Sequence, residues 1–536
     1  MGRVPLSIPP GLKPRATTQA TGKQWWDMSL VRWNGAELQP VGGWTKLPNM
    51  QLTAAVRGLL SWRDNSAERW IAAASLGEVV VYDTVGHNIT PTDFQAGVPG
   101  DLVDGYGIGA YGVGLYGTPR IPDVAFNPRG APGDTTSLSN WGENLVVCGS
   151  ADNRILWWIP DATVSTILVP VPPATPLPTE TAGIVHVVPR ARYAFVTDER
   201  CLVAIGADGD PRRVSWSDQE RPGAFTPDIV NLAGSLQLNS TGAAWAARKV
   251  PSGYLIFCDD DVHLMQWVGP PFAYGIVRIG TGCSSISPQA IVATAQRTVW
   301  MGQETFWIHE GVPRVLACDL QDRIFSNLNR NTQGRTVAAQ NGLFPEVWFF
   351  YPDNSSVEPN RYAAWNYQAN IWIGGLMART GVTEPGAYGV PLMGDVNGFV
   401  YAHENGWTAD GTMRGSTVFA ETGDMQLGEG DAATCVRAFI PDARNQAQLQ
   451  LHCALQVRDQ RGEEPDLVCA EFLLRIAAPH RNHRRNGTLD PQVRSHHRFN
   501  AVRLVPFVEN VGATMLLAGH KCFWHIHRGI YTAPSG

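Results

Sequence analysis

Residues 252–267 read Ser252-Gly-Tyr-Leu-Ile-Phe-Cys-Asp-Asp-Asp-Val-His-Leu-Met-Gln-Trp267. Two runs rich in β-branched and aromatic residues flank a short acidic turn, which is the sequence pattern of a β-hairpin. The pattern returns between Arg297 and His309, around a turn at Gly302-Gln-Glu304. The two turns lie about 45 residues apart, which is the length of one blade of a β-propeller. This repeat is the starting point for the rest of the chain.

Composition agrees with a chain of many short strands. The 536 residues include 55 Gly and 38 Pro, a high share of turn formers, and 19 Trp. Hydrophobic residues make up 44% and charged residues 17%, which is not the composition of a disordered protein. The net charge of −6 argues against a basic surface of the kind that binds nucleic acid over a whole domain. We therefore expect a mainly β protein with more than one domain.

Seven hairpin units can be traced along the chain. Their turns fall near residues 77, 152, 199, 260, 303, 353 and 396. Several intervals are in the forties and the longest is 75 residues, which indicates insertions between some units. This spacing predicts an irregular β-propeller of six or seven blades over residues 50–405. The competing interpretation is an all-β array without a true repeat.

The two ends of the chain are predicted to form a second, β-rich region. Residues 1–49 contain a proline-rich arm and a hairpin whose turn is Asn34-Gly35, and four tryptophans there need apolar partners. Residues 406–536 lose the propeller spacing and contain half-buried strand patterns such as Leu449–Val457. We expect residues 406–536 to form a platform domain on which the segment 1–49 docks.

No catalytic or cofactor motif is convincing. The glycine-rich stretch Gly105–Gly117 contains the formal pattern Gly107-x-Gly109-x-x-Gly112, but it lacks the strand and helix that a dinucleotide site requires. The sequence has no nucleophile elbow, phosphate loop or zinc-protease motif. We therefore predict that the protein is not an enzyme and has no catalytic residues and no cofactor.

Metal binding is not predicted either. Adjacent residues of a strand point to opposite faces, so Asp259-Asp-Asp261 is interpreted as a solvated turn, with weak Ca²⁺ binding as the alternative. His525 and His527 would share one strand face but supply only two of the three or four ligands that zinc needs. The nine cysteines form no Cys-x-x-Cys pair and are expected to be reduced and buried. No apolar run is long enough to cross a membrane.

One basic segment stands out near the C-terminus. It contains five arginines that we take as candidate contacts with a partner or with DNA: Arg481, Arg484, Arg485, Arg494 and Arg498. Such a cluster on a net-acidic protein can bind phosphates or an acidic surface. A solvated loop is the alternative.

Seven short motifs are spread along the whole chain: Pro9–Leu12, Trp25–Gly35, Gln39–Trp44, Leu115–Arg120, Ile276–Ser285, Val299–Gly311 and Ala420–Asp424. Together they resemble the tail nozzle proteins of short-tailed bacteriophages, also called tail tubular or packaged-DNA-stabilisation proteins. The similarity rests on loose motifs, with no counterpart for the arginine segment.

The resemblance implies a propeller with a platform domain, assembled as a ring of six below the portal and adaptor rings of the virion. Its role would be structural: the ring extends the DNA channel, retains the packaged DNA and conducts it on ejection. Partners would be other copies, portal and adaptor proteins, tail fibre or needle proteins, and double-stranded DNA. The protein would be made in the host cytoplasm and reside in the virion tail. The alternative is a tail-associated propeller that binds or cleaves carbohydrate.

Overall fold

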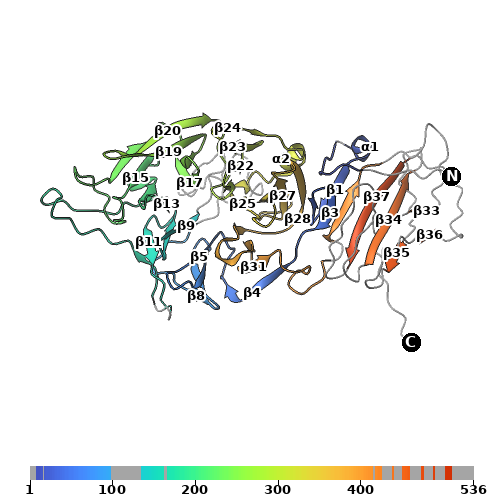
Figure 1. Ribbon diagram of the computed structural model, residues 1–536, viewed down its shortest axis with the longest axis horizontal. Helices are drawn as coiled ribbons and strands as arrows, with labels where there is room; N and C mark the ends of the chain where they lie inside the picture. Colours follow the sequence, from blue (N-terminus) through green and yellow to red (C-terminus); the bar gives the residue numbers. More distant parts are fainter. Residues whose placement is uncertain are drawn as a thin grey trace, which may run out of the picture. The chain divides into compact units, whose positions relative to one another are not determined.

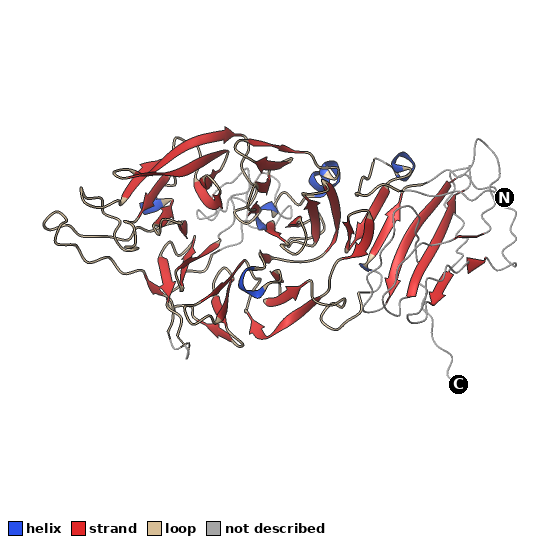
Figure 2. Cartoon of the chain, viewed as in Figure 1, coloured by secondary structure: helices blue, strands red, loops and turns tan. Residues whose placement is uncertain are grey.

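The computed structural model describes residues 8–15, 17–97, 135–161, 164, 166–414 and 417–424, and the backbone of five strands farther along. Strands dominate these residues and the helices are short (Figure 2). The helices are α1 (Thr18–Thr21) and α2 (Gln321–Asn327), with 3-10 turns η1 (Ala207–Gly209), η2 (Gln333–Arg335) and η3 (Gly386–Tyr388).

The chain divides into two compact units. One comprises Met1–Thr45, Ala363–Met377 and His403–Gly536, and the other comprises Lys46–Tyr362 and Ala378–Ala402. Each unit is therefore assembled from segments that lie far apart in the sequence.

Seven four-stranded antiparallel sheets repeat along the chain (Figure 1). Their first strands are β5 (Gly58–Arg63), β9 (Thr136–Trp141), β13 (Tyr193–Val196), β17 (Ala244–Val250), β21 (Ile291–Ala293), β25 (Val337–Gln340) and β29 (Gly381–Thr383). Their second strands are β6 (Arg69–Ala74), β10 (Asn144–Gly149), β14 (Leu202–Ile205), β18 (Gly253–Cys258), β22 (Thr298–Met301), β26 (Glu346–Tyr351) and β30 (Leu392–Gly394).

The remaining strands complete each sheet in the same order. The third strands are β7 (Val79–Tyr82), β11 (Ile155–Trp158), β15 (Arg213–Trp216), β19 (Asp261–Gly269), β23 (Phe306–His309), β27 (Arg361–Asn366) and β31 (Phe399–His403). The fourth strands are β8 (Gly86–Asn88), β12 (Val169–Pro170), β16 (Gly234–Gln237), β20 (Ala273–Thr281), β24 (Pro313–Leu316), β28 (Ile371–Leu376) and β4 (Trp44–Gln51).

The first strands close a ring. Each contacts the first strand of the next sheet, from β5 through β9, β13, β17, β21, β25 and β29, and β29 contacts β5 again. A closed circle of radially repeated four-stranded sheets is a β-propeller, here with seven blades. The predicted fold class is confirmed, and the blade number is the higher of the two expected.

The seventh blade joins both ends of the propeller. Its first three strands come from residues 381–403, and its fourth is β4, which lies before the first blade in the sequence. The sequence-based prediction assigned all of residues 1–49 to the platform region. That assignment was wrong for β4, because closing the ring requires an N-terminal strand to pair beside β31.

Side chains between neighbouring blades form the core. In the fourth blade, Ile256, Cys258 and Met265 face a cluster shared with the third blade, whereas Leu255 and Phe257 face the fifth. Similar clusters join blades one and two, two and three, and seven and one. The continuous apolar runs that identified the hairpins thus reflect burial on both faces of each sheet, as in β18, where five successive residues are buried.

The seven predicted turns all lie within blades, but one has a different position. In six blades the predicted turn joins the second and third strands. The turn near residue 199 instead joins the first and second strands of blade three, and the equivalent turn there lies at Gly206–Arg212. Both turns carry residues with positive φ, including Arg200 and Gly206, so the local signal does not distinguish them.

The other unit combines N-terminal and C-terminal strands. β1 (Trp25–Ser29) is the edge of a sheet in the order β1-β32-β37-β34-β35, whose other members are β32 (Phe419–Thr422), β37 (Ala501–Glu509), β34 (Gln450–Arg458) and β35 (Phe472–Arg475). The same unit contains two sheets of two strands each. One is the hairpin of β2 (Val31–Asn34) and β3 (Glu37–Pro40), and the other pairs β33 (Ala438–Phe439) with β36 (Gly487–Thr488).

A buried ion pair fixes the hairpin of β2 and β3. Arg32 is fully buried and donates from Nη1 and Nη2 to the two oxygens of Glu404, at 3.0 and 2.6 Å. The backbone N–H of Gly42 also donates to Glu404, at 3.0 Å. A bidentate pair of this kind specifies geometry as well as energy.

Replacing Gly398 by alanine should test the closure of the seventh blade. Gly398 has φ +82°, and a Cβ there would lie 2.1 Å from the carbonyl oxygen of Leu52. Gly209 has the same φ with open space around it, so Gly209→Ala is the matched control. The left-handed backbone costs alanine about 1–2 kcal/mol at both sites, and overpacking adds about 1–3 kcal/mol only at Gly398. Equal losses in urea unfolding would contradict a tight contact at the closure.

Candidate functional site

The sequence-predicted site residues lie outside the described part of the chain. This holds for the arginine candidates, for the glycine-rich stretch 105–117 and for His525 and His527. Their predicted roles stay predictions. The candidate sites below come from residues that the sequence alone did not single out for function.

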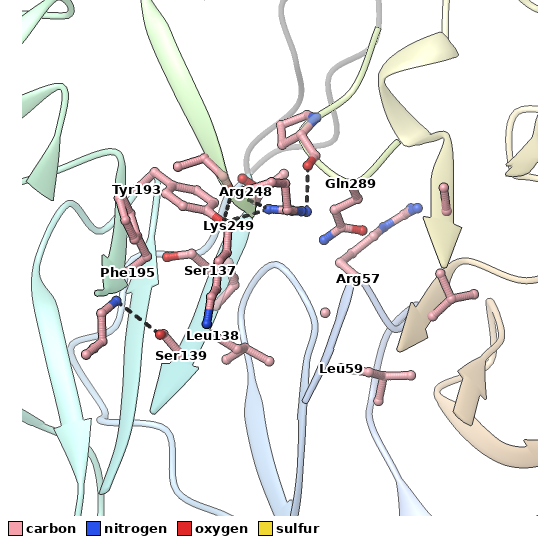
Figure 3. A pocket seen from close by; sticks show the side chains of 18 of the residues that line it. Arg57, Leu59, Ser137, Leu138, Ser139, Tyr193, Phe195, Arg248, Lys249 and Gln289 are labelled. Carbon is pink, nitrogen blue, oxygen red and sulfur yellow. Dashed lines mark hydrogen bonds between the residues drawn. The ribbon is translucent and has the colours of Figure 1, made fainter. Parts of the chain in front are cut away.

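A cavity of about 320 Å³ lies among the first strands of the blades (Figure 3). Arg57 lies on the side opposite Tyr193 and Phe195, and Arg248 and Lys249 come from β17. Serine hydroxyls of β9 and the amide of Gln289 add further polar groups. Among the described residues, the lining contains no aspartate or glutamate, so these residues present cationic and neutral groups to the cavity.

Arg248 fastens three blades together at this cavity. Its guanidinium donates to the hydroxyl of Tyr193 in blade three (2.8 Å) and to the carbonyl oxygen of Ala247 in blade four (2.9 Å). It also donates to the carbonyl oxygens of Pro288 (2.8 Å) and Ile291 (3.2 Å) beside and within blade five. The planar fork of donors suits this geometry, which a lysine ammonium does not reproduce. Arg248 therefore has a structural role, which is to link blades three, four and five.

Arg57 is also engaged. It donates to Glu358 at 2.6 Å, and Glu358 accepts a second hydrogen bond from Arg335. These contacts join the start of blade one to blade six. Hydrolysis of a glycosidic bond ordinarily needs two carboxyl groups, and the lining of this cavity supplies neither. The cavity can hold a small polar molecule, but not a DNA duplex, whose major groove alone is about 12 Å wide.

The acidic turn differs from its prediction. Asp259 is exposed and accepts a hydrogen bond from the backbone N–H of Ala243, as expected for a turn residue. Asp261 is buried in β19, however, next to Cys258 and His263. The prediction of three solvated carboxylates was wrong for Asp261, because the two-residue turn ends before it and strand pairing turns its side chain inward.

The described cysteines agree with the predicted thiols. Five are free, and all but Cys318 are buried. Burial raises the pKa of the Cys148 thiol to about 12 and that of Cys201 to about 11. Both are therefore protonated and unreactive near neutral pH.

Two loops of the propeller unit form a second candidate site, which we call the loop pair (residues 172–188 and 218–231). The carboxylate of Glu180 is buried between the loops and accepts hydrogen bonds from Leu177 N (2.7 Å), Arg221 (2.8 Å) and Asn231 (3.2 Å). The imidazole of His186 lies 3.1 Å away. The Arg221 guanidinium, helped by the other donors, holds the pKa of Glu180 well below its usual range.

Further hydrogen bonds join the two loops. The hydroxyl of Thr226 donates to the carbonyl oxygen of Val185 (2.7 Å), and the N–H of Thr181 donates to Asp228 (3.0 Å). The first loop, which begins with the proline-rich stretch Pro172–Pro178, is therefore held by a polar network. In Figure 1 the first of these loops is the teal one at the left edge.

The loop pair presents aliphatic side chains to solvent. Ile229 is 96% exposed, and Val185, Val187 and Val230 are 69%, 62% and 52% exposed. Single exposed aliphatic residues are ordinary, but a group of them on an ordered support is typical of a contact surface. This site is suited to protein association and not to chemistry.

None of the helices in the described ranges is long and apolar enough to cross a membrane.

Comparisons with known proteins add little. No protein-family model matches the sequence, and no curated protein matches it. Among solved structures, Hsv2 of Kluyvelomyces marxianus is similar at 6% identity and a TM-score of 0.28, over 48% of this chain and 71% of that one. The AfRom2 CNH domain is similar at 8% identity and a TM-score of 0.33, over 67% and 98%. The propeller assignment therefore rests on the ring of sheets itself.

Replacing Arg248 by methionine should destabilise the propeller strongly. The change keeps much of the side-chain volume but leaves four oxygen acceptors without their charged donor, and each such bond contributes about 1.5–3 kcal/mol. We expect a loss of roughly 3 kcal/mol or more in thermal or urea unfolding. Lys249→Met is the matched control, because Lys249 pairs with Asp198 in a solvent-exposed ion pair worth about 1 kcal/mol or less. Similar losses of stability for both variants would contradict this structural role of Arg248.

Replacing Glu180 by glutamine should destabilise the loop pair in a pH-dependent way. A carboxyl group with a lowered pKa stabilises the folded state fully above its unfolded pKa of about 4.3 and progressively less below it. Glu180→Gln should therefore lower the free energy of unfolding by about 1.5–3 kcal/mol near pH 7. The difference in this free energy between the variant and the unmodified chain should shrink as the pH falls below about 4.3. Glu220→Gln, which affects an exposed pair with Arg200, is the control. A pH-independent difference would refute the charge effect.

Proposed function

We propose that this chain is a structural protein of a bacteriophage tail, a nozzle subunit that assembles into a ring with other copies of itself. The observation that carries the proposal is the loop pair, an ordered surface with exposed aliphatic side chains. Together with the sequence resemblance, it favours a protein that works by contacting other proteins. The cavity without carboxylates gives no comparable support to a glycan-cleaving propeller.

In this proposal the DNA channel lies between copies of the chain. The cavity among the first strands is crossed by the bonds of Arg248 and is too small for a duplex. A ring of six copies, as the resemblance implies, would instead enclose the DNA. The net charge of −6 suits a conduit, because a wall that neutralised many phosphates would retain the DNA.

The partners follow from the same proposal. Portal or adaptor proteins would contact one end of the ring, fibre or needle proteins would contact the other, and the arginine segment from Arg481 to Arg498 would meet one of them or the DNA. We assign the loop pair to the neighbouring copy within the ring, because exposed aliphatic side chains suit a permanent contact.

The ring can be observed directly. Electron microscopy of the mature particle should show copies of the chain arranged around an axis below the portal. Antibody labelling of the chain identifies its position. Finding the chain only as isolated monomers or in peripheral fibres would refute the nozzle proposal.

The loop pair gives a second test. Replacing Ile229 and Val230 together by aspartate should weaken self-association at least tenfold, because two charges would have to be desolvated at the contact. Thermal stability should stay within about 0.5 kcal/mol of the unmodified chain, since both side chains are exposed. Val312→Asp is the matched control at another exposed valine. Normal association of the double variant, measured by analytical ultracentrifugation, would rule out this contact.

A further inference from the structure

A buried group of three potential metal ligands lies in the fourth blade. The Sγ atom of Cys258 is 3.8 Å from Nδ1 of His263, and this nitrogen is 3.7 Å from Oδ1 of Asp261. Candidate ligand atoms of all three residues lie within 4.8 Å of one another. All three residues are buried: Cys258 is 0% exposed, His263 is 2% exposed and Asp261 is 3% exposed.

Strand pairing explains why these residues meet. β18 ends at Cys258 and β19 begins at Asp261, with Ile256 opposite His263 in the ladder. Asp261 and His263 lie two positions apart and therefore share one face of β19. Cys258 occupies the neighbouring position on the same face, which packs toward the third blade.

We propose that Cys258, Asp261 and His263 form a buried zinc site with three protein ligands. Thiolate, imidazole and carboxylate are the side-chain ligands that Zn²⁺ takes in proteins, and the thiolate makes Ca²⁺ an unsuitable occupant. Zinc–ligand bonds of about 2.0–2.3 Å in a tetrahedron place ligand atoms about 3.4–3.6 Å apart. The separations from His263 to Cys258 and to Asp261 need to contract by only a few tenths of an ångström, and the thiol and the carboxylate lie within 4.8 Å of each other.

The surroundings are compatible with a bound cation. The hydroxyl of Ser240 donates to Oδ1 of Asp261 at 2.8 Å and can orient the carboxylate, as groups next to metal ligands commonly do. Burial lowers the pKa of His263, so the neutral ring offers a lone pair. Burial also raises the pKa of the Cys258 thiol, and zinc must displace its proton on binding.

Charged groups at the site decide whether it can hold a cation. Arg278, which is partly exposed, lies 3.9 Å from Oδ2 of Asp261 and opposes a cation. The carboxylate and the thiolate together supply two negative charges, which compensate the charge of Zn²⁺. Among the described residues no further Cys, His, Asp or Glu joins the group, so water is the expected fourth ligand. The site would fasten the turn of blade four to the segment containing Ser240.

Metal analysis of the purified full-length chain tests the proposal. After growth with zinc and dialysis against metal-free buffer, mass spectrometry should find about one Zn²⁺ per chain. Replacement by Co²⁺ should give the intense near-ultraviolet band of a cobalt–thiolate bond. Cys258→Ser should abolish that band, and Cys258→Ser and His263→Gln should each lower the metal affinity at least tenfold, with Asp261→Asn weakening binding less severely.

Controls separate this site from other thiols and histidines. Cys148→Ser removes an equally buried thiol from the second strand of blade two and should leave the metal content unchanged. Circular dichroism checks that each variant is folded. Zn²⁺ should raise the melting temperature of the unmodified chain and of Cys148→Ser, but not that of Cys258→Ser or His263→Gln. Absence of stoichiometric metal in the unmodified chain would overturn the proposal. So would metal that persists in the Cys258 and His263 variants and disappears when His525 and His527 are replaced.

Discussion

The seventh blade is the constraint on which the propeller unit depends. Its sheet combines β4 with three strands that lie more than 300 residues later in the sequence. Until the propeller closes, β29 and β5 do not contact each other and the ring of first strands stays open. The apolar cluster around Val56, Leu392 and Val400 forms only in the closed arrangement. Closure therefore links the local hairpins, which can form independently, to one cooperative structure.

Sequence periodicity revealed the hairpins because each blade buries both faces and its turns are short. It did not fix the blade number, since the connector between blades one and two and the proline-rich connector interrupt the spacing. It also missed β4, whose hydrogen-bonding partner lies at the other end of the propeller. Trp44–Gln51 contains Pro48 and does not pair with β3 or β5, the strands next to it in the sequence, so no local signal identifies it as part of a blade.

The candidate sites were predictable to different degrees. The cavity could not be predicted, because its lining combines residues of several first strands separated by up to hundreds of positions. The cluster of Cys258, Asp261 and His263 carried a usable signal. A two-residue turn at Asp259-Asp260 fixes the register, and this register places the three side chains on one face. The interpretation of Asp259, Asp260 and Asp261 as turn residues missed this signal, because it did not place Asp261 in the strand.

Polar contacts between blades have a physical role that apolar packing does not fill. Neighbouring blades share no backbone ladder, so dispersion and burial hold them together without strong directional preference. Arg248 joins blades three, four and five, and Glu358 joins blades six and one through Arg57. These bonds restrict sliding of one sheet over another because a charged donor left unpaired in the interior is costly. A metal at Cys258, Asp261 and His263 would constrain the turn of blade four, from which all three ligands come. A subunit that must keep its shape within a ring would benefit from such fixed angles more than from additional apolar surface.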